Sequence, residues 1–266
     1  MSTVRRPKLG QHFLTSDRYR LRVAEALPIG TGDLVIEIGA GRGAMTGLIA
    51  ERAGQVVAVE LDASLAEQLK ARFGTSNHVE ILQGDILELD IAEVCRRHGV
   101  ERAFVFGNLP YYITSPILHR LLQFGDHLSG MAFVVQREVA LRIAAKPGSR
   151  DYGYLSVLVQ TCTCPRVAFS IPPGAFTPPP AVFSAFVTFD MSGMLPTVGE
   201  RSAFLEFVKL GFGQKRKKLS NNLSSAYGTV RVREALRGLN ISENARAEQL
   251  AVIELEKLFE ALKRQC

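Results

Sequence analysis

Short apolar runs alternate with helical patterns through residues 34–145, and this alternation constrains the fold more than any other feature of the 266-residue chain. Such alternation is typical of a mainly parallel sheet with helices on both faces. The expected strands lie at 34–38, 56–62, 79–85, 103–107 and 131–135, and the expected helices at 18–28, 44–53, 65–73, 91–98, 116–124 and 136–145. We therefore predict an α/β fold.

Two further strands are expected at 154–162 and 182–189, as an antiparallel pair at the sheet edge, because no helix of normal length separates them. After residue 200, the apolar residues recur at the spacing of a helix throughout. The predicted organisation is a basic arm that covers the cofactor (1–22), a sheet domain (23–190), a linker (191–200) and a small all-helical domain (201–266).

Basic residues gather at the two ends of the chain. Residues 1–22 hold six Lys or Arg and one acid, and residues 191–266 hold thirteen Lys or Arg and eight acids. Each of these ends therefore carries a net charge of +5, whereas the whole chain carries only +6. The middle is therefore slightly acidic. Basic ends around an acidic middle indicate a polyanionic partner, although a solvated basic surface explains charge alone equally well.

Asn108, Leu109, Pro110 and Tyr111 follow the expected strand at 103–107. Ligands of open α/β sheets bind where strands end. The Asn108 side-chain oxygen accepts hydrogen bonds, and the extended backbone before a proline can direct the Leu109 carbonyl outward. A tyrosine ring can stack on a flat base. Two acceptors beside an aromatic ring predict a site for a planar exocyclic amine.

Three glycines, Gly39, Gly41 and Gly43, lie between the first strand of the alternation and the next helix. Glycines allow the backbone to approach a ligand closely. With the alanine that follows, the same letters satisfy a dinucleotide-binding fingerprint. The glycines alone therefore leave NAD and a methyl donor equally open.

Acids at the carboxyl ends of three consecutive strands favour the methyl donor. Glu60 can bind ribose hydroxyls, and Asp85 can accept from an adenine amino group. Glu37, just before the first glycine, would repel a pyrophosphate. A cofactor with an adenosine and a cationic amino-acid end, S-adenosylmethionine, fits this set better than NAD.

Six segments resemble, in order, the small-subunit ribosomal RNA adenine N6,N6-dimethyltransferases of the kasugamycin-sensitivity type. They lie at 11–14, 37–41, 60–62, 84–87, 108–111 and 176–182. The resemblance covers nearly the whole chain, and Asn-Leu-Pro-Tyr together with Phe-x-Pro-x-Pro is its most specific part. It implies a class I (Rossmann-like) methyltransferase fold with a C-terminal helical domain that faces RNA.

The resemblance also implies where the donor binds. The implied contacts are His12, Leu14, Gly39, Glu60, Asp85 and Asn108, to which the glycine turn adds Gly41. The family usually has Asn at the position of His12. No CxxC or Cys/His zinc spacing occurs, so no metal is expected.

The expected catalytic residues are Asn108, Leu109, Pro110, Tyr111 and Phe176. If Asn108 and Leu109 accept both hydrogens of adenine N6, the nitrogen lone pair is localised for attack on the sulfonium methyl. Asn108 then acts as an acceptor and not as a general base. Tyr111 is expected to stack on the base and Phe176 to close its other face, after the base has turned out of its helix.

A basic run, Lys215, Arg216, Lys217 and Lys218, is expected on a helix surface that follows RNA phosphates. The expected partner is small-subunit RNA within an immature subunit, where two adjacent adenines near the 3′ end are implied by the resemblance. A cytoplasmic monomer without a membrane span is expected. The alternatives are an erythromycin-resistance type methyltransferase of large-subunit RNA, a non-catalytic RNA-binding assembly or transcription factor that keeps the donor pocket, and an NAD-dependent oxidoreductase.

Overall fold

The computed structural model describes residues 12–191, 198–214 and 217–263. These residues divide into two compact units, a sheet unit (12–140 and 166–191) and a helical unit (141–165 with the described residues from 198 onward). The domain boundaries expected from the sequence stay predictions. The predicted boundaries placed residues 141–165 in the sheet domain, whereas the structure groups them with the helical unit.

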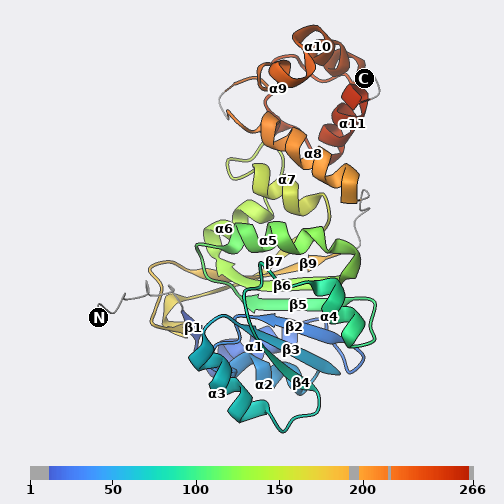
Figure 1. Cartoon of the computed structure of the whole chain (residues 1–266). Helices are drawn as coiled ribbons and strands as arrows, with labels where there is room; N and C mark the ends of the chain where they lie inside the picture. Colours follow the sequence, from blue (N-terminus) through green and yellow to red (C-terminus); the bar gives the residue numbers. More distant parts are fainter. Residues whose placement is uncertain (1–11, 192–197, 215–216, 264–266) are drawn as a thin grey trace, which may run out of the picture. The chain divides into compact units, whose positions relative to one another are not determined.

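Seven strands of the described residues form one sheet in the order β4-β3-β2-β5-β6-β9-β7, which can be followed in Figure 1. The strands are β2 Leu34–Ile38, β3 Gln55–Glu60, β4 Val79–Gln83, β5 Ala103–Asn108, β6 Leu128–Gln136, β7 Cys164–Ile171 and β9 Ser184–Asp190. The first five in spatial order pair in parallel, and β9 pairs with β6 antiparallel. The predicted α/β sheet is therefore confirmed, and its parallel strands end at one edge.

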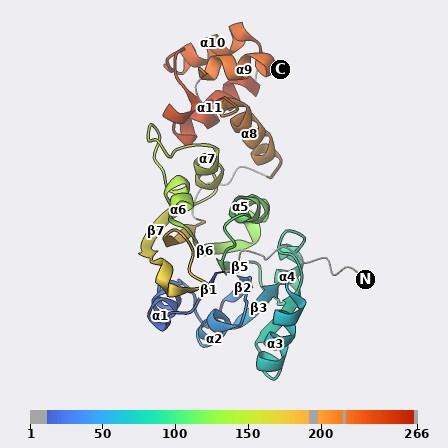
Figure 2. The same cartoon turned by 90° about the vertical axis from the view of Figure 1, so that its left-hand side faces the viewer.

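Helices cover both faces of this sheet. They are α1 Asp17–Ala26, α2 Ala44–Ala50, α3 Ala63–Phe73, α4 Ile91–Arg97, α5 Thr114–Gln123 and α6 Arg137–Ile143. Short 3-10 turns lie at Gly125–His127 and Pro173–Ala175. Figure 2 places α1 and α5 on opposite sides of the strands.

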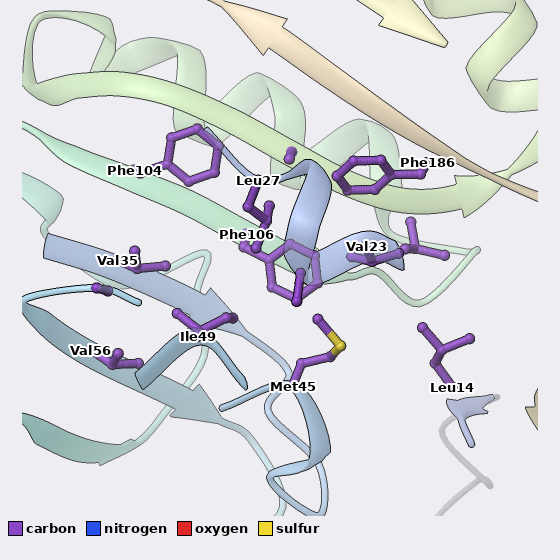
Figure 3. Close-up of a cluster of buried hydrophobic side chains, with 14 of the residues drawn as sticks. Leu14, Val23, Leu27, Val35, Met45, Ile49, Val56, Phe104, Phe106 and Phe186 are labelled. Atoms are coloured by element: carbon purple, nitrogen blue, oxygen red, sulfur yellow. The ribbon is translucent and has the colours of Figure 1, made fainter. Parts of the chain in front are cut away.

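The core on the α1 and α2 side holds alternate residues of the central strands, since successive side chains of a strand point to opposite faces. Figure 3 shows Val23 of α1 and Met45 of α2 beside Val35, Phe104 and Phe106 of the sheet. All five side chains are buried. This packing fixes the carboxyl ends of β2 and β5, from which the site is built.

A second, two-stranded sheet joins the N-terminal segment to the loop before β9. Strand β1 (Phe13–Leu14) pairs antiparallel with β8 (Phe176–Thr177), so that Phe13 faces Thr177 and Leu14 faces Phe176. Leu14 is 5% exposed and belongs to the core. The N-terminal segment is thus anchored beside the glycine turn from residue 12 onward.

The expected strand at 154–162 is wrong, because these residues form helix α7 (Tyr154–Gln160). The edge strand begins later, at Cys164, and neighbours β9. Residues 156–159 are all buried, so the helix has no polar face whose 3.6-residue period would show in the sequence. Ser156 fixes its start, since its Oγ accepts from the Gly153 amide at 3.1 Å and donates to the Arg142 carbonyl at 2.5 Å.

The remaining helices belong to the helical unit. They are α8 Val198–Gly211, α9 Leu219–Tyr227, α10 Thr229–Gly238 and α11 Val252–Lys263, with a 3-10 turn at Ala247–Gln249. Phe207 of α8 contacts the rings of Phe204, Tyr227 and Phe259 at 5.5–6.2 Å between centroids, which joins three of these helices. Among the helices that the structure describes, none combines the length and apolar character needed to span a bilayer.

Candidate active site

Three cavities meet at Gly39, where β2 ends. Cavity A, of about 370 Å³, is lined among others by Glu37, Asn108, Thr177 and Pro178. Cavity B, of about 40 Å³, is lined by the Asn108–Tyr111 segment with His12, Phe13, Gly39, Gly41 and Glu60. Cavity C, of about 60 Å³, lies between the ends of β2, β3 and β4 and is lined among others by Glu60, Leu61, Asp85, Ile86 and Tyr112. Gly39 lines all three, and Asn108 lines the first two.

The glycine turn needs its glycines for two different reasons. Gly39, Gly41 and Gly43 have φ values of 68°, 58° and 75°, a left-handed conformation that strains other residues. A Cβ at Gly43 would lie 2.7 Å from the Phe73 ring, and one at Gly41 would lie 2.8 Å from the Phe13 ring. A Cβ at Gly39 would meet no atom within 4 Å, because it would point into open space.

Two of the predicted acids lie at the carboxyl ends of β3 and β4. Glu60 is buried, and its two carboxylate oxygens accept from the amides of Gly41 and Asp62 at 2.8 and 2.9 Å. Glu60 therefore holds the glycine turn, and each of its oxygens keeps a second lone pair for a ligand. Asp85 accepts from the Leu87 amide at 2.9 Å and lines cavity C.

The amide of Asn108 is held in one orientation by the N-terminal segment. Its Nδ2 donates to the carbonyl oxygen of His12 at 2.8 Å. A carbonyl only accepts, so the amide nitrogen must face His12, and Oδ1 remains as the acceptor end. The Leu109 amide donates to the Val134 carbonyl at 3.0 Å, which anchors the next residue.

Tyr111 lies beside His12 at cavity B. The two rings stack with centroids 5.4 Å apart and planes 27° apart, and the Tyr111 hydroxyl bonds to Ser184 Oγ at 2.7 Å. Burial raises the pKa of Tyr111. The His12 ring also bonds through Nδ1 to the Pro178 carbonyl at 2.7 Å, which makes Nδ1 the protonated nitrogen. One face of Tyr111 is therefore occupied by His12.

Glu37 corrects one step of the cofactor argument. Its side chain is 2% exposed and accepts from Thr46 Oγ1 at 2.5 Å. Burial raises its pKa to about 8, although the Thr46 bond lowers it, and the charge of Glu60 adds a smaller rise. The carboxyl is mostly neutral at pH 7, so the expected repulsion of a pyrophosphate by Glu37 is wrong.

Other predicted residues lie apart from these cavities. Phe176 is 3% exposed in the hydrophobic core and lines none of them, so this conformation does not bring its ring to the site. Lys217 and Lys218 belong to the helical unit. Both lysines were expected on the surface of a helix, but they lie just before α9 begins. Lys218 has an extended backbone, with φ −61° and ψ 146°. Lys215 and Arg216 lie outside the described residues, as does the arm up to residue 11.

Several residues around the site were missed by the sequence reasoning. Thr46 holds Glu37, Ser184 holds Tyr111, and Phe13 covers Gly41. Ser184 begins β9 opposite Gln136, a register that no local pattern reveals. In the described ranges, no group of three or more His, Cys, Asp or Glu side chains is placed to hold a metal.

The sequence matches one protein family over nearly its whole length. The family described as "Ribosomal RNA adenine dimethylase" matches residues 3–264. The chain is 41% identical to "Ribosomal RNA small subunit methyltransferase A" of Koribacter versatilis, over 98% of this chain and 95% of the relative. Identity is 40% to the protein of the same name from Geobacter sulfurreducens, over 97% and 95%.

Two solved structures share the fold. A dimethyladenosine transferase from Plasmodium falciparum matches with a TM-score of 0.81 at 19% identity, over 96% of this chain and 98% of that one. The 23S rRNA methyltransferase ErmE matches with a TM-score of 0.72 at 24% identity, over 94% and 99%. The predicted class I methyltransferase fold with added C-terminal helices is therefore confirmed.

Proposed function

The chain belongs to the ribosomal RNA adenine dimethylases, and we propose that it dimethylates N6 of two adjacent adenines near the 3′ end of small-subunit ribosomal RNA. The observation that carries this proposal is 41% identity, over nearly its whole length, to a relative named for small-subunit RNA methylation. The reaction uses S-adenosylmethionine. We further propose that the protein acts as a cytoplasmic monomer on an immature subunit.

The residues around Gly39 fit the donor. S-adenosylmethionine supplies a methyl group that its sulfonium sulfur activates for transfer. The open space beside Gly39 admits a ligand against the backbone, and the oxygens of Glu60 and Asp85 offer acceptors for ribose hydroxyls and an adenine amino group. The proposed donor contacts are His12, Leu14, Gly39, Gly41, Glu60, Asp85 and Asn108.

The chain's contribution to methyl transfer is to orient the target nitrogen. Asn108 Oδ1 and the Leu109 carbonyl accept the two N6 hydrogens, which favours a pyramidal nitrogen with a localised lone pair. Pro110 offers no competing N–H. Tyr111 stacks on the base with the ring face that His12 does not occupy, and the N6 proton leaves to water after transfer. A role for Phe176 on the second face requires movement of its ring out of the core.

Methyl transfer from labelled S-adenosylmethionine tests the proposal. The purified protein is offered immature small subunits, deproteinised small-subunit RNA and large subunits, and the RNA is digested to nucleosides. We expect labelled N6,N6-dimethyladenosine from immature small subunits alone. Label in the large subunit would favour the resistance-type alternative. Intact RNA binding without any transfer would favour the non-catalytic alternative.

A further inference from the structure

Three arginines line cavity A, and two of them stand at its exposed rim. Arg42 lies in the glycine turn, Arg72 in α3, and Arg20 in α1. Arg72 Nη1 donates to the Arg42 carbonyl at 3.0 Å, which keeps these two residues together. Arg42 lies 5.3 Å from the ring centroid of Phe13, and Arg72 lies 4.9 Å from that of Phe73. Aromatic faces thus hold both guanidinium groups in place.

The charge on this rim is not neutralised within the protein. In the part of the chain that the structure describes, neither Arg42 nor Arg72 forms an ion pair with a carboxylate, whereas Arg20 pairs with the exposed Asp17. The one acid that lines the cavity is Glu37, whose burial keeps it mostly neutral. Two unpaired guanidinium groups beside a neutral carboxyl make an anion site.

The position of the cavity decides which anion fits. Asn108 lines both cavity A and cavity B, so the three arginines line a cavity that also contains the residue proposed to receive the adenine. The donor carries a net positive charge and lies against Gly39, whereas Arg42 and Arg72 face solvent. A phosphodiester matches the planar fork of an arginine and tolerates an exposed site.

We propose that Arg42 and Arg72, assisted by Arg20, bind a phosphate of the RNA strand beside the turned-out adenosine. The inference rests on the proposed function, because it takes Asn108 as the residue that receives the target base. The site positions the strand and does not read its sequence. Release of counterions from the bound phosphate makes this contribution dependent on salt.

The test compares the double variant Arg42→Gln/Arg72→Gln with the wild-type protein. Affinity for deproteinised small-subunit RNA is measured between 50 and 300 mM KCl with saturating S-adenosylhomocysteine, and S-adenosylhomocysteine affinity is measured without RNA. We expect RNA affinity to fall about tenfold at low salt and the log–log salt slope to decrease by roughly 1.5, since each lost contact removes about 0.7–0.9. S-adenosylhomocysteine affinity stays within twofold.

The matched control is Arg96→Gln/Arg102→Gln, which removes two exposed arginines at the opposite edge of the sheet, near the amino end of β5. This control is expected to keep the wild-type slope. Weakened S-adenosylhomocysteine binding with unchanged RNA binding would assign the arginines to the donor carboxylate and overturn the proposal, as would an unchanged slope. Neither readout needs methyl transfer, so an inactive wild-type protein that binds RNA would refute the proposed function and not this inference.

Discussion

At the scale of single residues, Asn108 shows how one hydrogen bond can fix which end of an amide side chain faces a binding site. Its residue type and its place at a strand end suffice to predict an acceptor. Its orientation depends on a carbonyl 96 positions earlier in the chain, a contact that no local pattern contains. The sequence therefore predicts what Asn108 can do, whereas the three-dimensional structure determines which end of the amide is available.

Replacement of that amide should remove turnover and leave RNA binding intact. For Asn108→Ala we expect kcat to fall by about 100-fold or more, the size typical of a lost transition-state hydrogen bond. RNA affinity should stay within twofold, because the phosphate contacts remain. Single-turnover methyl transfer and RNA binding measure the two effects. The exposed Asn77→Ala serves as the control, and an Asn108→Ala variant with near wild-type turnover would refute the assigned role.

Glu37 predicts a pH dependence of stability. Its pKa is about 8 in the folded protein and 4.5 in the unfolded chain, so the folded state binds more protons between these values. The contribution of Glu37 to the free energy of unfolding is therefore fully present below pH 4.5 and is lost as the pH rises toward 8. Urea denaturation at pH 5, 6.5 and 8 should show this decline in the wild-type protein.

Glu37→Gln isolates this effect, because glutamine cannot ionise and its side-chain oxygen still accepts the Thr46 bond. The variant should lose less stability than the wild-type protein between pH 5 and pH 8. Parallel stability profiles for the two proteins would show that Glu37 titrates normally.

At the scale of elements, two glycines of the same turn are expected to serve different purposes, Gly43 the packing of the fold and Gly39 the binding of a ligand. Gly39→Ala and Gly43→Ala each add a methyl group at positive φ, which costs about 1–2 kcal/mol. Gly43→Ala also drives that methyl group into Phe73 and Leu69 of α3, which adds about 1–3 kcal/mol. Gly39→Ala meets only the open space that the three cavities share.

We therefore expect Gly43→Ala to lower the free energy of unfolding by more than Gly39→Ala, and Gly39→Ala to weaken S-adenosylhomocysteine binding about tenfold or more. Denaturant titration and calorimetric binding measure the two quantities on the same pair of proteins. Equal stability losses with equal binding would show that neither position has the contacts described here.

The elements also show where sequence reasoning stops. Strands β2 to β6 were predicted well, because their apolar runs are flanked by turns and by helices with a polar face. Helix α7 was missed, because burial on all sides removed the period that distinguishes a helix from a strand. Phe176 was expected at the site from its motif, yet its place in the core follows from its pairing with Leu14 across β1 and β8.

At the scale of the whole molecule, the three cavities and the basic run belong to different units. All three cavities are lined by residues of the sheet unit, and the described lysines of the basic run lie in the helical unit. The sequence places the change to a helical apolar period after a linker at 191–200, and this boundary stays a prediction. The sequence did not predict that residues 141–165 group with the later helices, because this grouping depends on contacts between residues that are far apart in the chain.

Charge reversal in the helical unit should therefore affect binding and leave chemistry unchanged. For Lys217→Glu we expect a several-fold loss of RNA affinity and a shallower salt slope, with kcat at saturating RNA unchanged, because lost phosphate contacts weaken binding alone. Lys257→Glu makes the same charge change on an exposed position of α11 and is the control. If both variants lose RNA affinity equally, net charge and not the position of Lys217 is responsible.

The hydrogen bond that the Asn108 amide donates to the His12 carbonyl has a consequence for how position 12 can evolve. The contact uses the carbonyl of residue 12, so it constrains the path of the chain and not the identity of the side chain. A different residue at position 12, such as asparagine, can keep the same orientation of the Asn108 amide. Substitutions at position 12 should therefore keep the orientation of the Asn108 amide, although they remove the ring that stacks on Tyr111 and bonds to Pro178. A mutational library at position 12 should tolerate more residues than one at position 108.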